Sequence, residues 1–269
     1  MEKRKKREKR PIEYATDGLL FILKSPYYLI RGIYRLIHKT AEDIKKRKSI
    51  EKRELIKSKY EEFKIIHQIE GEYKKLIEEI YKADSKIGIV LGARGSGKTA
   101  FGIKFLENVH AKTKKKCFAI GFHEEELPAW IKVVSDINSL HNDSFVLIDE
   151  GGILFSSRSS MSNPNKLLSE LMLIARHKNI SILFISQNSS NLEINILRQA
   201  DFLALKPSSL LQKEFERKII QKMYENTEEE FKRFKDNKGL VYIYSSNFRG
   251  FISNSLPSFW KESISKSFK

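Results

Sequence analysis

The sequence has almost no cysteine: Cys117 is the only one in 269 residues, which excludes any disulfide within the chain. Its beginning, MEKRKKREKR, is followed by Pro11 rather than by an apolar segment, so we expect no signal peptide. Long hydrophobic runs are also lacking, because Lys24 and Pro26 interrupt the apolar stretch that begins at Gly18. No cluster of cysteine and histidine offers a zinc site. These absences predict a cytoplasmic protein without a membrane-spanning helix.

Positive charge dominates what the sequence does contain. The formal net charge is +16, and the excess is densest in the first 82 residues. Such a balance favours polyanionic partners, either nucleic acid or an anionic membrane surface. The alternative is that the many lysine residues serve solubility alone.

The first 82 residues form the first of two predicted parts, a basic helical extension. Within residues 1–40, apolar residues recur at helical spacing after Pro26, with Arg31 and Arg35 between them. A basic amphipathic helix suits a membrane, virion or portal surface, although packing on its own domain is the alternative. Residues 41–82 lack proline and predict one long helix with a narrow apolar stripe: Ile66, Ile69, Tyr73, Leu76 and Ile80.

The second predicted part is an α/β domain at 83–269, where strand patterns alternate with helix patterns. This alternation predicts a parallel sheet with helices on both faces. The expected strands are 86–91, 117–122, 145–148, 180–186 and 202–206. The expected helices are 99–111, 128–140, 165–177, 210–224 and 227–236. Segments 240–245 and 248–253 predict a closing hairpin.

The stretch GARGSGKT, residues 92–99, predicts a phosphate-binding loop. Its glycines let backbone N–H groups converge on phosphate oxygens, and the following helix points its positive end at the anion. Lys98 is expected to reach the outer phosphates, and the Thr99 hydroxyl to bind Mg²⁺. The loop follows an expected strand and opens an expected helix, which is the context that this motif requires. The expected nucleotide-binding residues are Gly92, Ala93, Arg94, Gly95, Ser96, Gly97, Lys98, Thr99 and Ala100.

Acidic and amide side chains follow two further expected strands. Asp149 and Glu150 end the strand FVLIDE, at the edge where ligands bind in open α/β sheets. Asp149 is expected to hold Mg²⁺, and Glu150 to orient and deprotonate the attacking water, which favours hydrolysis. Gln187 directly follows ISILFIS and is expected to sense the terminal phosphate or polarise the water. The alternative for Gln187 is a simple turn residue.

Two arginines are candidates for a catalytic finger that reaches a neighbouring subunit's nucleotide. Arg176 ends the helix before the fourth expected strand, and Arg158 lies in the polar loop after Glu150. Positive charge near a helix C-terminus is equally explained by the helix dipole.

From Asp149 through LMLIARHKNISILFISQNSSNLEINILRQADFLALKPSS, the chain resembles the FtsK–HerA superfamily of DNA-pumping ATPases. Its small size and the order of its motifs are similar to the viral and mobile-element branch, which includes genome-packaging ATPases and Zot-like assembly proteins. The resemblance covers residues 86–206 well and leaves the first 82 residues outside. It implies ATP and Mg²⁺ as cofactors, a homo-hexameric ring and DNA threaded through the pore.

Three functions remain open at this point. An ATP-driven DNA translocase for genome packaging or transfer of mobile-element DNA comes first. A Zot-like ATPase for virion assembly or secretion at a membrane is the alternative, which would use the amphipathic segment. A nucleotide-dependent scaffold or switch would bind ATP but hydrolyse it very slowly.

Overall fold

The computed structural model describes residues 31, 33–40, 44, 47–82, 85–150 and 164–266. The chain divides into two compact units, residues 1–52 and residues 53–269. In the first unit, residues 33–40 and 47–52 are helical. Among the described residues, no helix is both long and apolar enough to cross a membrane. The second unit holds the sheet and all of the elements named below.

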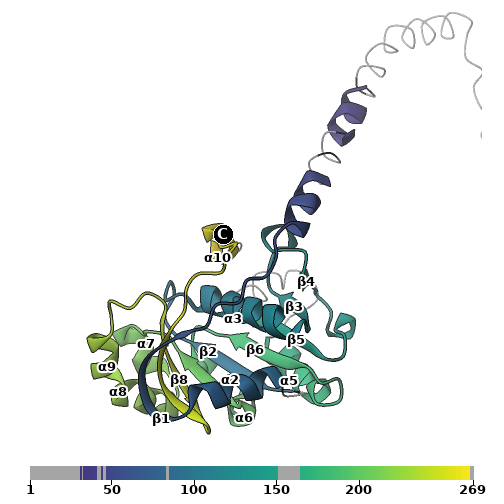
Figure 1. The fold of residues 1–269 in the computed structure, drawn as a ribbon. Coiled ribbons are helices and arrows are strands. Elements are labelled where there is room, and N and C mark those ends of the chain that lie inside the picture. The colour runs from purple at the N-terminus through teal and green to yellow at the C-terminus, as the bar shows by residue number, and fades with distance from the viewer. Residues whose placement is uncertain are drawn as a thin grey trace, which may run out of the picture. The chain divides into compact units, whose positions relative to one another are not determined.

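The second unit alternates strands and helices through most of its length (Figure 1). Its strands are β1 (Lys64–Gly71), β2 (Ile87–Leu91), β3 (Lys116–Ile120), β4 (Ile131–Val133), β5 (Ser144–Asp149), β6 (Ser181–Ile185), β7 (Phe202–Leu205), β8 (Leu240–Ser245) and β9 (Phe248–Ser253). Its helices are α2 (Tyr73–Lys82), α3 (Lys98–Thr113), α5 (Pro164–Ala175), α6 (Ile194–Gln199), α7 (Leu210–Phe215), α8 (Lys218–Asn226), α9 (Glu228–Arg233) and α10 (Glu262–Lys266).

The strands form a single sheet in the order β1-β9-β8-β7-β2-β6-β5-β3-β4. The six from β7 to β4 are parallel, whereas β8, β9 and β1 add antiparallel pairs at one end. In this order β6 lies between β2, which leads into the glycine loop, and β5, which ends at Asp149. The predicted α/β fold with a mainly parallel sheet is therefore confirmed. The predicted hairpin of β8 and β9 is also present.

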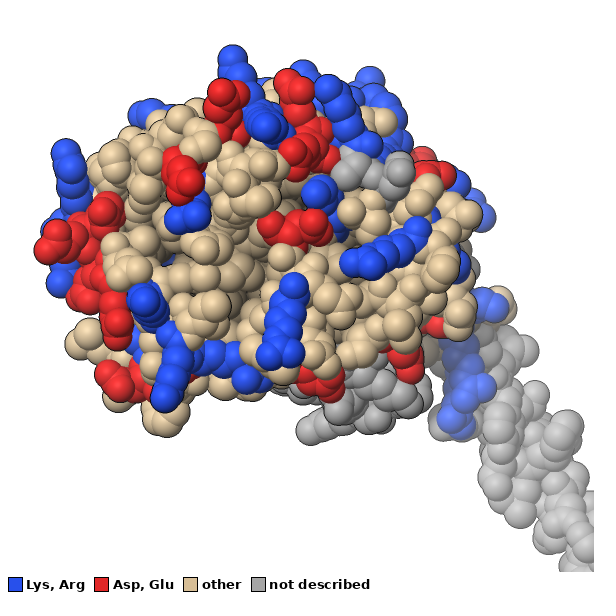
Figure 2. Space-filling view, turned by 90° about the horizontal axis from the view of Figure 1, so that it is seen from below, with Lys and Arg blue, Asp and Glu red and all other residues tan. Residues whose placement is uncertain are grey.

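Charge is mixed rather than gathered on one face of the protein. Figure 2 shows Lys and Arg side chains interspersed with Asp and Glu around a broad area of other residues on the face seen from below. Elsewhere in the described residues, opposite charges pair directly, as in Lys232–Glu228 with 2.8 Å between Nζ and Oε1. The basic excess of the sequence does not form one continuous patch on this face.

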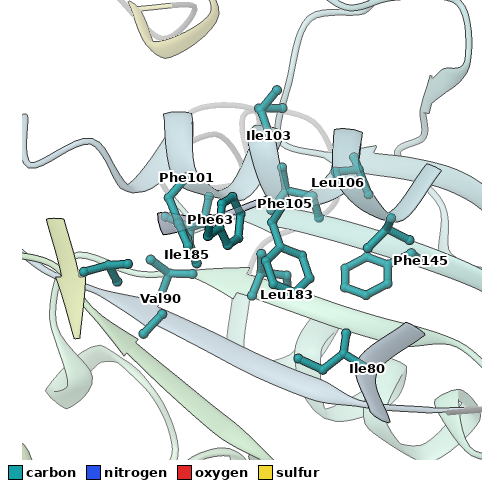
Figure 3. Packing of buried hydrophobic residues seen from close by; sticks show 14 of the residues in the cluster. Phe63, Ile80, Val90, Phe101, Ile103, Phe105, Leu106, Phe145, Leu183 and Ile185 are labelled. Carbon is teal, nitrogen blue, oxygen red and sulfur yellow. The ribbon is translucent and has the colours of Figure 1, made fainter. Parts of the chain in front are cut away.

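Two apolar cores lie on the two faces of the sheet. Helices α2 and α3 pack on one face, and α5, α6 and α8 pack on the other. In Figure 3, Phe101 and Phe105 of α3 face the sheet, and Phe105 lies by Leu183 and Phe145. All four of these side chains are at most 3% exposed. Since burying one such side chain contributes about 1.5–3 kcal/mol, this layer holds the first turns of α3 firmly against β5 and β6.

The long helix expected over residues 41–82 is wrong for residues 55–63, which are not helical, and for the segment 64–71. This segment forms β1, which pairs antiparallel with β9 at the edge of the sheet, and only the part from Tyr73 to Lys82 is helical beyond it. Gly71 separates the two with a φ of +73°, and a Cβ there would lie 2.0 Å from Asn247 O. Residues 64–82 therefore belong to the second compact unit, which begins at Arg53. Pairing with a distant strand overrode the local helical spacing.

Two other expected helices are corrected. Residues 128–140 contain the short strand β4 and a 3-10 turn at Ile137–Ser139, because β4 adds to the free edge of β3. The helix expected over 210–224 is divided into α7 and α8 by Glu216 and Arg217, whose backbones are extended. At this break, the side chain of Glu216 accepts hydrogen bonds from Ser189 N and Ser189 Oγ.

Candidate nucleotide-binding site

The glycine loop connects β2 to α3, as the sequence predicts. Gly95 and Gly97 have φ values of +78° and +87°, a backbone region that residues with a Cβ rarely occupy. Gly92 has φ +149°, and a Cβ there would lie 2.6 Å from the Cβ of Lys206. The loop backbone therefore takes a path that only glycine permits at these positions.

The loop is anchored to the end of β7. Ala93 N donates to Pro207 O at 3.1 Å, and Ser96 N donates to Ala93 O at 3.1 Å. Arg94 is exposed, whereas Ala100 is buried in the first turn of α3. Ser96 Oγ is a buried atom with no hydrogen-bond partner among the described residues. Buried polar atoms normally have a partner, so this hydroxyl fits a site built for a polar ligand.

Lys98 lies folded across the loop. Its Nζ donates to Gly92 O at 2.8 Å and to Ala93 O at 2.9 Å, and the residue is 7% exposed. Burial lowers the pKa of Lys98 to about 8, although the charges of Asp149, Glu150 and Glu216 oppose this shift. The ammonium group is held mainly by neutral carbonyls. A phosphate group would supply the anionic partner that these carbonyls do not.

Thr99 and Asp149 bring two oxygen groups together from different elements. Thr99 Oγ1, in the first turn of α3, donates to Asp149 Oδ2 at the end of β5 at 3.1 Å. Mg²⁺ prefers oxygen ligands and is commonly held by one or two protein groups together with substrate phosphates. These two residues therefore fit a Mg²⁺ ion bound beside the phosphates.

Glu150 and Gln187 lie at the same sheet edge. Glu150 is 5% exposed and accepts a hydrogen bond from Ser186 Oγ. Gln187 is the residue after Ser186. Its side chain is exposed, and its backbone carbonyl accepts a hydrogen bond from Gln212 Nε2 of α7. The edge thus brings together the predicted loop, metal ligands and base. The role of the Gln187 side chain stays a prediction.

Of the two candidate finger arginines, the structure describes only Arg176, and Arg176 does not join this group. Arg176 is exposed and follows α5 at the amino edge of the parallel strands, where Lys178 O accepts from Asp143 N just before β5. The length of β6, about 15 Å at 3.3 Å per residue, separates this edge from the glycine loop. Arg176 is therefore too far from the glycine loop of its own chain to contact a nucleotide there, and its role as a finger stays a prediction. Arg158 lies outside the described residues.

Three nearby residues were not predicted from the sequence. Ser186 binds Glu150, Glu216 is 5% exposed and accepts from Ser189 N and Ser189 Oγ, and Lys206 is completely buried behind the loop. Of these three, only Ser186 could have been suspected from the sequence, because it ends the apolar run ISILFIS and directly precedes Gln187. Glu216 and Lys206 carry no motif, and their positions follow from how α7 and β7 pack.

A parallel sheet with a glycine loop before a helix, and an acidic strand separated from the loop strand by one other strand, defines the P-loop NTPase fold. The family model described as zonular occludens toxin (Zot) matches residues 107–204. This range contains Asp149, Glu150 and Gln187 but begins after the glycine loop. The match confirms a resemblance to the Zot family over this part of the chain.

Solved structures give further similarities. The DNA-packaging ATPase B204 from Sulfolobus Turreted Icosahedral Virus is 16% identical, with a TM-score of 0.43, over 64% of this chain and 98% of that chain. The genome-packaging NTPase B204 from Sulfolobus turreted icosahedral virus 2, in complex with AMP, is 16% identical, with a TM-score of 0.44, over 64% of this chain and 99% of that chain. ATPases 2 and 3 of EssC from Geobacillus thermodenitrificans are 11% identical, with a TM-score of 0.41, over 79% of this chain and 48% of that chain. Comparison with curated protein sequences gives no match.

Proposed function

We propose that this protein is a Mg²⁺-dependent ATPase that translocates DNA, in packaging a viral genome or transferring mobile-element DNA. The observation that carries the proposal is the meeting of Lys98, Thr99, Asp149 and Glu150 at one sheet edge. A cation, two metal ligands and a base are the groups that hydrolysis of a phosphoanhydride requires. The resemblance of residues 107–204 to the Zot family is compatible with this role and with the second candidate below.

Each residue then has a defined task. Lys98 neutralises the outer phosphates, and Glu150 accepts a proton from the water that attacks the terminal phosphorus. Thr99 and Asp149 would hold Mg²⁺, which supplies charge neutralisation of the phosphates when bound. Gln187 is proposed to sense the terminal phosphate from the end of β6.

The test is ATP hydrolysis with and without DNA over a salt series. Lys98→Ala should lose nucleotide binding, and Glu150→Gln should keep it while kcat falls at least 100-fold. Exposed Lys222 on α8 provides the matched control Lys222→Ala, which should behave as wild type. DNA stimulation should weaken steeply with salt, because backbone contacts release counterions. Normal turnover by Glu150→Gln would refute the assignment of the base. Slow hydrolysis that ignores DNA would instead favour a nucleotide-dependent switch.

Assembly into a ring, as a homo-hexamer, is part of the same proposal. It is supported by four exposed apolar side chains beside the site: Leu210, Leu211, Phe215 and Ile219. They are 59–78% exposed, and such a concentration marks a surface that another molecule covers. Light scattering of the wild type with ATP and Mg²⁺ measures the assembly, and a strict monomer would contradict it.

A Zot-like ATPase for virion assembly at a membrane is the second candidate. The described helix at 33–40 favours it, because Ile33, Tyr34, Leu36 and Ile37 are 48–66% exposed between basic residues. A basic amphipathic helix of this kind binds anionic lipid surfaces. Binding of the full chain to vesicles of anionic lipid, together with hydrolysis that ignores DNA, would establish this candidate over the first.

A further inference from the structure

Ser186 immediately follows β6 and lies between the two halves of the proposed catalytic site. Ile185 of β6 is paired with Asp149 of β5, so Ser186 and Glu150 are the next residues outward on these two strands. On its other side, Ser186 N donates to Val90 O of β2 at 2.9 Å, two residues before the glycine loop begins. Ser186 thus connects the strand that carries the loop to the carboxylate that follows the acidic strand.

The hydroxyl of Ser186 is held in place. Its Oγ donates to Glu150 Oε2, lies 3.0 Å from Asn188 O, and accepts from Asn188 N at 3.3 Å. Asn188 is fixed in turn, since its Oδ1 accepts from Ser190 N at 2.8 Å. Ser186 is 1% exposed and Glu150 is 5% exposed, so water competes little for this hydrogen bond.

We propose that Ser186 is a positioning residue that holds Glu150 in the orientation needed to activate water. This inference rests on the proposed ATPase function. With Oε2 bound to Ser186, Oε1 is the oxygen that accepts the proton from water. The water oxygen then forms a bond to the terminal phosphorus, and the bond from this phosphorus to its bridging oxygen breaks, which leaves ADP and phosphate. A misplacement of about 1 Å in such a base costs about 100-fold in rate.

The first experiment compares Ser186→Ala with Ser181→Ala. Ser181 is the matched control, because it is also completely buried and lies at the opposite end of β6, where its Oγ accepts from Lys86 N at 3.1 Å. We expect Ser186→Ala to lower kcat 10- to 100-fold and leave the Kd for ATP within twofold. Ser181→Ala should keep the wild-type kcat. Ser186→Thr, which retains the hydroxyl, should recover most of the rate.

A double-mutant cycle separates positioning from a general loss of structure. On the Glu150→Gln background, Ser186→Ala should lower kcat less than twofold further, because the residue acts through Glu150. If the double variant instead loses kcat by the product of the two single-variant factors, the residues act independently and the proposal is overturned. If Ser186→Ala does not fold, Ser186→Cys has a similar size and a weaker donor, and it should lower kcat several-fold.

The outcomes also distinguish this inference from the function on which it rests. Wild-type kcat in Ser186→Ala, with Glu150→Gln inactive, would overturn the positioning role alone. Wild-type kcat in Glu150→Gln would remove the proposed base and the positioning role together. Absence of hydrolysis by the wild type, with and without DNA, would overturn both.

Discussion

Lys206 offers a prediction whose magnitude follows from the structure. Its Nζ donates to Gly239 O and to Asn254 Oδ1, each at 2.8 Å, and lies 5.3 Å from the centroid of the Phe101 ring. None of these partners carries a full negative charge, and the residue is completely buried. Burial therefore lowers the pKa of Lys206 to about 7, from 10.5 in an exposed lysine.

The sign of the stability effect follows from proton binding. Between pH 7 and pH 10.5 the unfolded chain keeps Lys206 protonated while the folded chain releases the proton. The unfolded state then binds more protons, so the free energy of unfolding rises with pH in this window. At about 1.4 kcal/mol per pH unit, the rise from pH 7 to pH 9 is about 2 kcal/mol. Lys206→Met removes the titrating group and with it this rise.

The assay is urea unfolding of wild type and Lys206→Met between pH 6 and pH 9. Methionine leaves Gly239 O and Asn254 Oδ1 without their donor, so the absolute stability at one pH mixes two effects. The difference between the two pH profiles isolates the titration. The exposed lysine variant Lys222→Met should keep the wild-type profile. Parallel profiles for wild type and Lys206→Met would refute the lowered pKa.

Two further predictions concern buried charges on α3. Since phosphate binding should restore the charge of Lys98, ATP binding near pH 8 should take up a proton, and affinity should fall as the pH rises above 8. Calorimetry in two buffers of different ionisation enthalpy measures this uptake, and a wild type without it would contradict the lowered pKa. Glu107 is completely buried, 3.0 Å from Lys104 Nζ, and accepts from Ser258 N at 3.1 Å. Glu107→Gln should lower the free energy of unfolding by about 3–5 kcal/mol in urea, whereas the exposed control Glu225→Gln should lie within about 0.5 kcal/mol of wild type.

Local patterns in the sequence determined much of the site. Gly92, Gly95 and Gly97 have backbone angles that only glycine adopts readily. The loop can therefore be recognised from the spacing of its glycines. The apolar runs before Gly92 and Asp149 required buried strands, and parallel strands expose their carboxyl ends at one edge. These local patterns alone therefore predict the loop, the acidic pair and Gln187 at one edge of the sheet.

Only the tertiary structure decided which strand lies beside which. The position of β6 between β2 and β5 brings Ser186 to Glu150, and no sequence spacing encodes that neighbour. The pairing of β1 with β9 overrode a helical pattern, because backbone hydrogen bonds to a distant strand outweighed local spacing. Lys206 is an ordinary lysine in the sequence, and its burial among neutral acceptors results from packing between β7 and the segments that hold Gly239 and Asn254. Contacts between residues far apart in the chain set these positions, so they are absent from any local pattern.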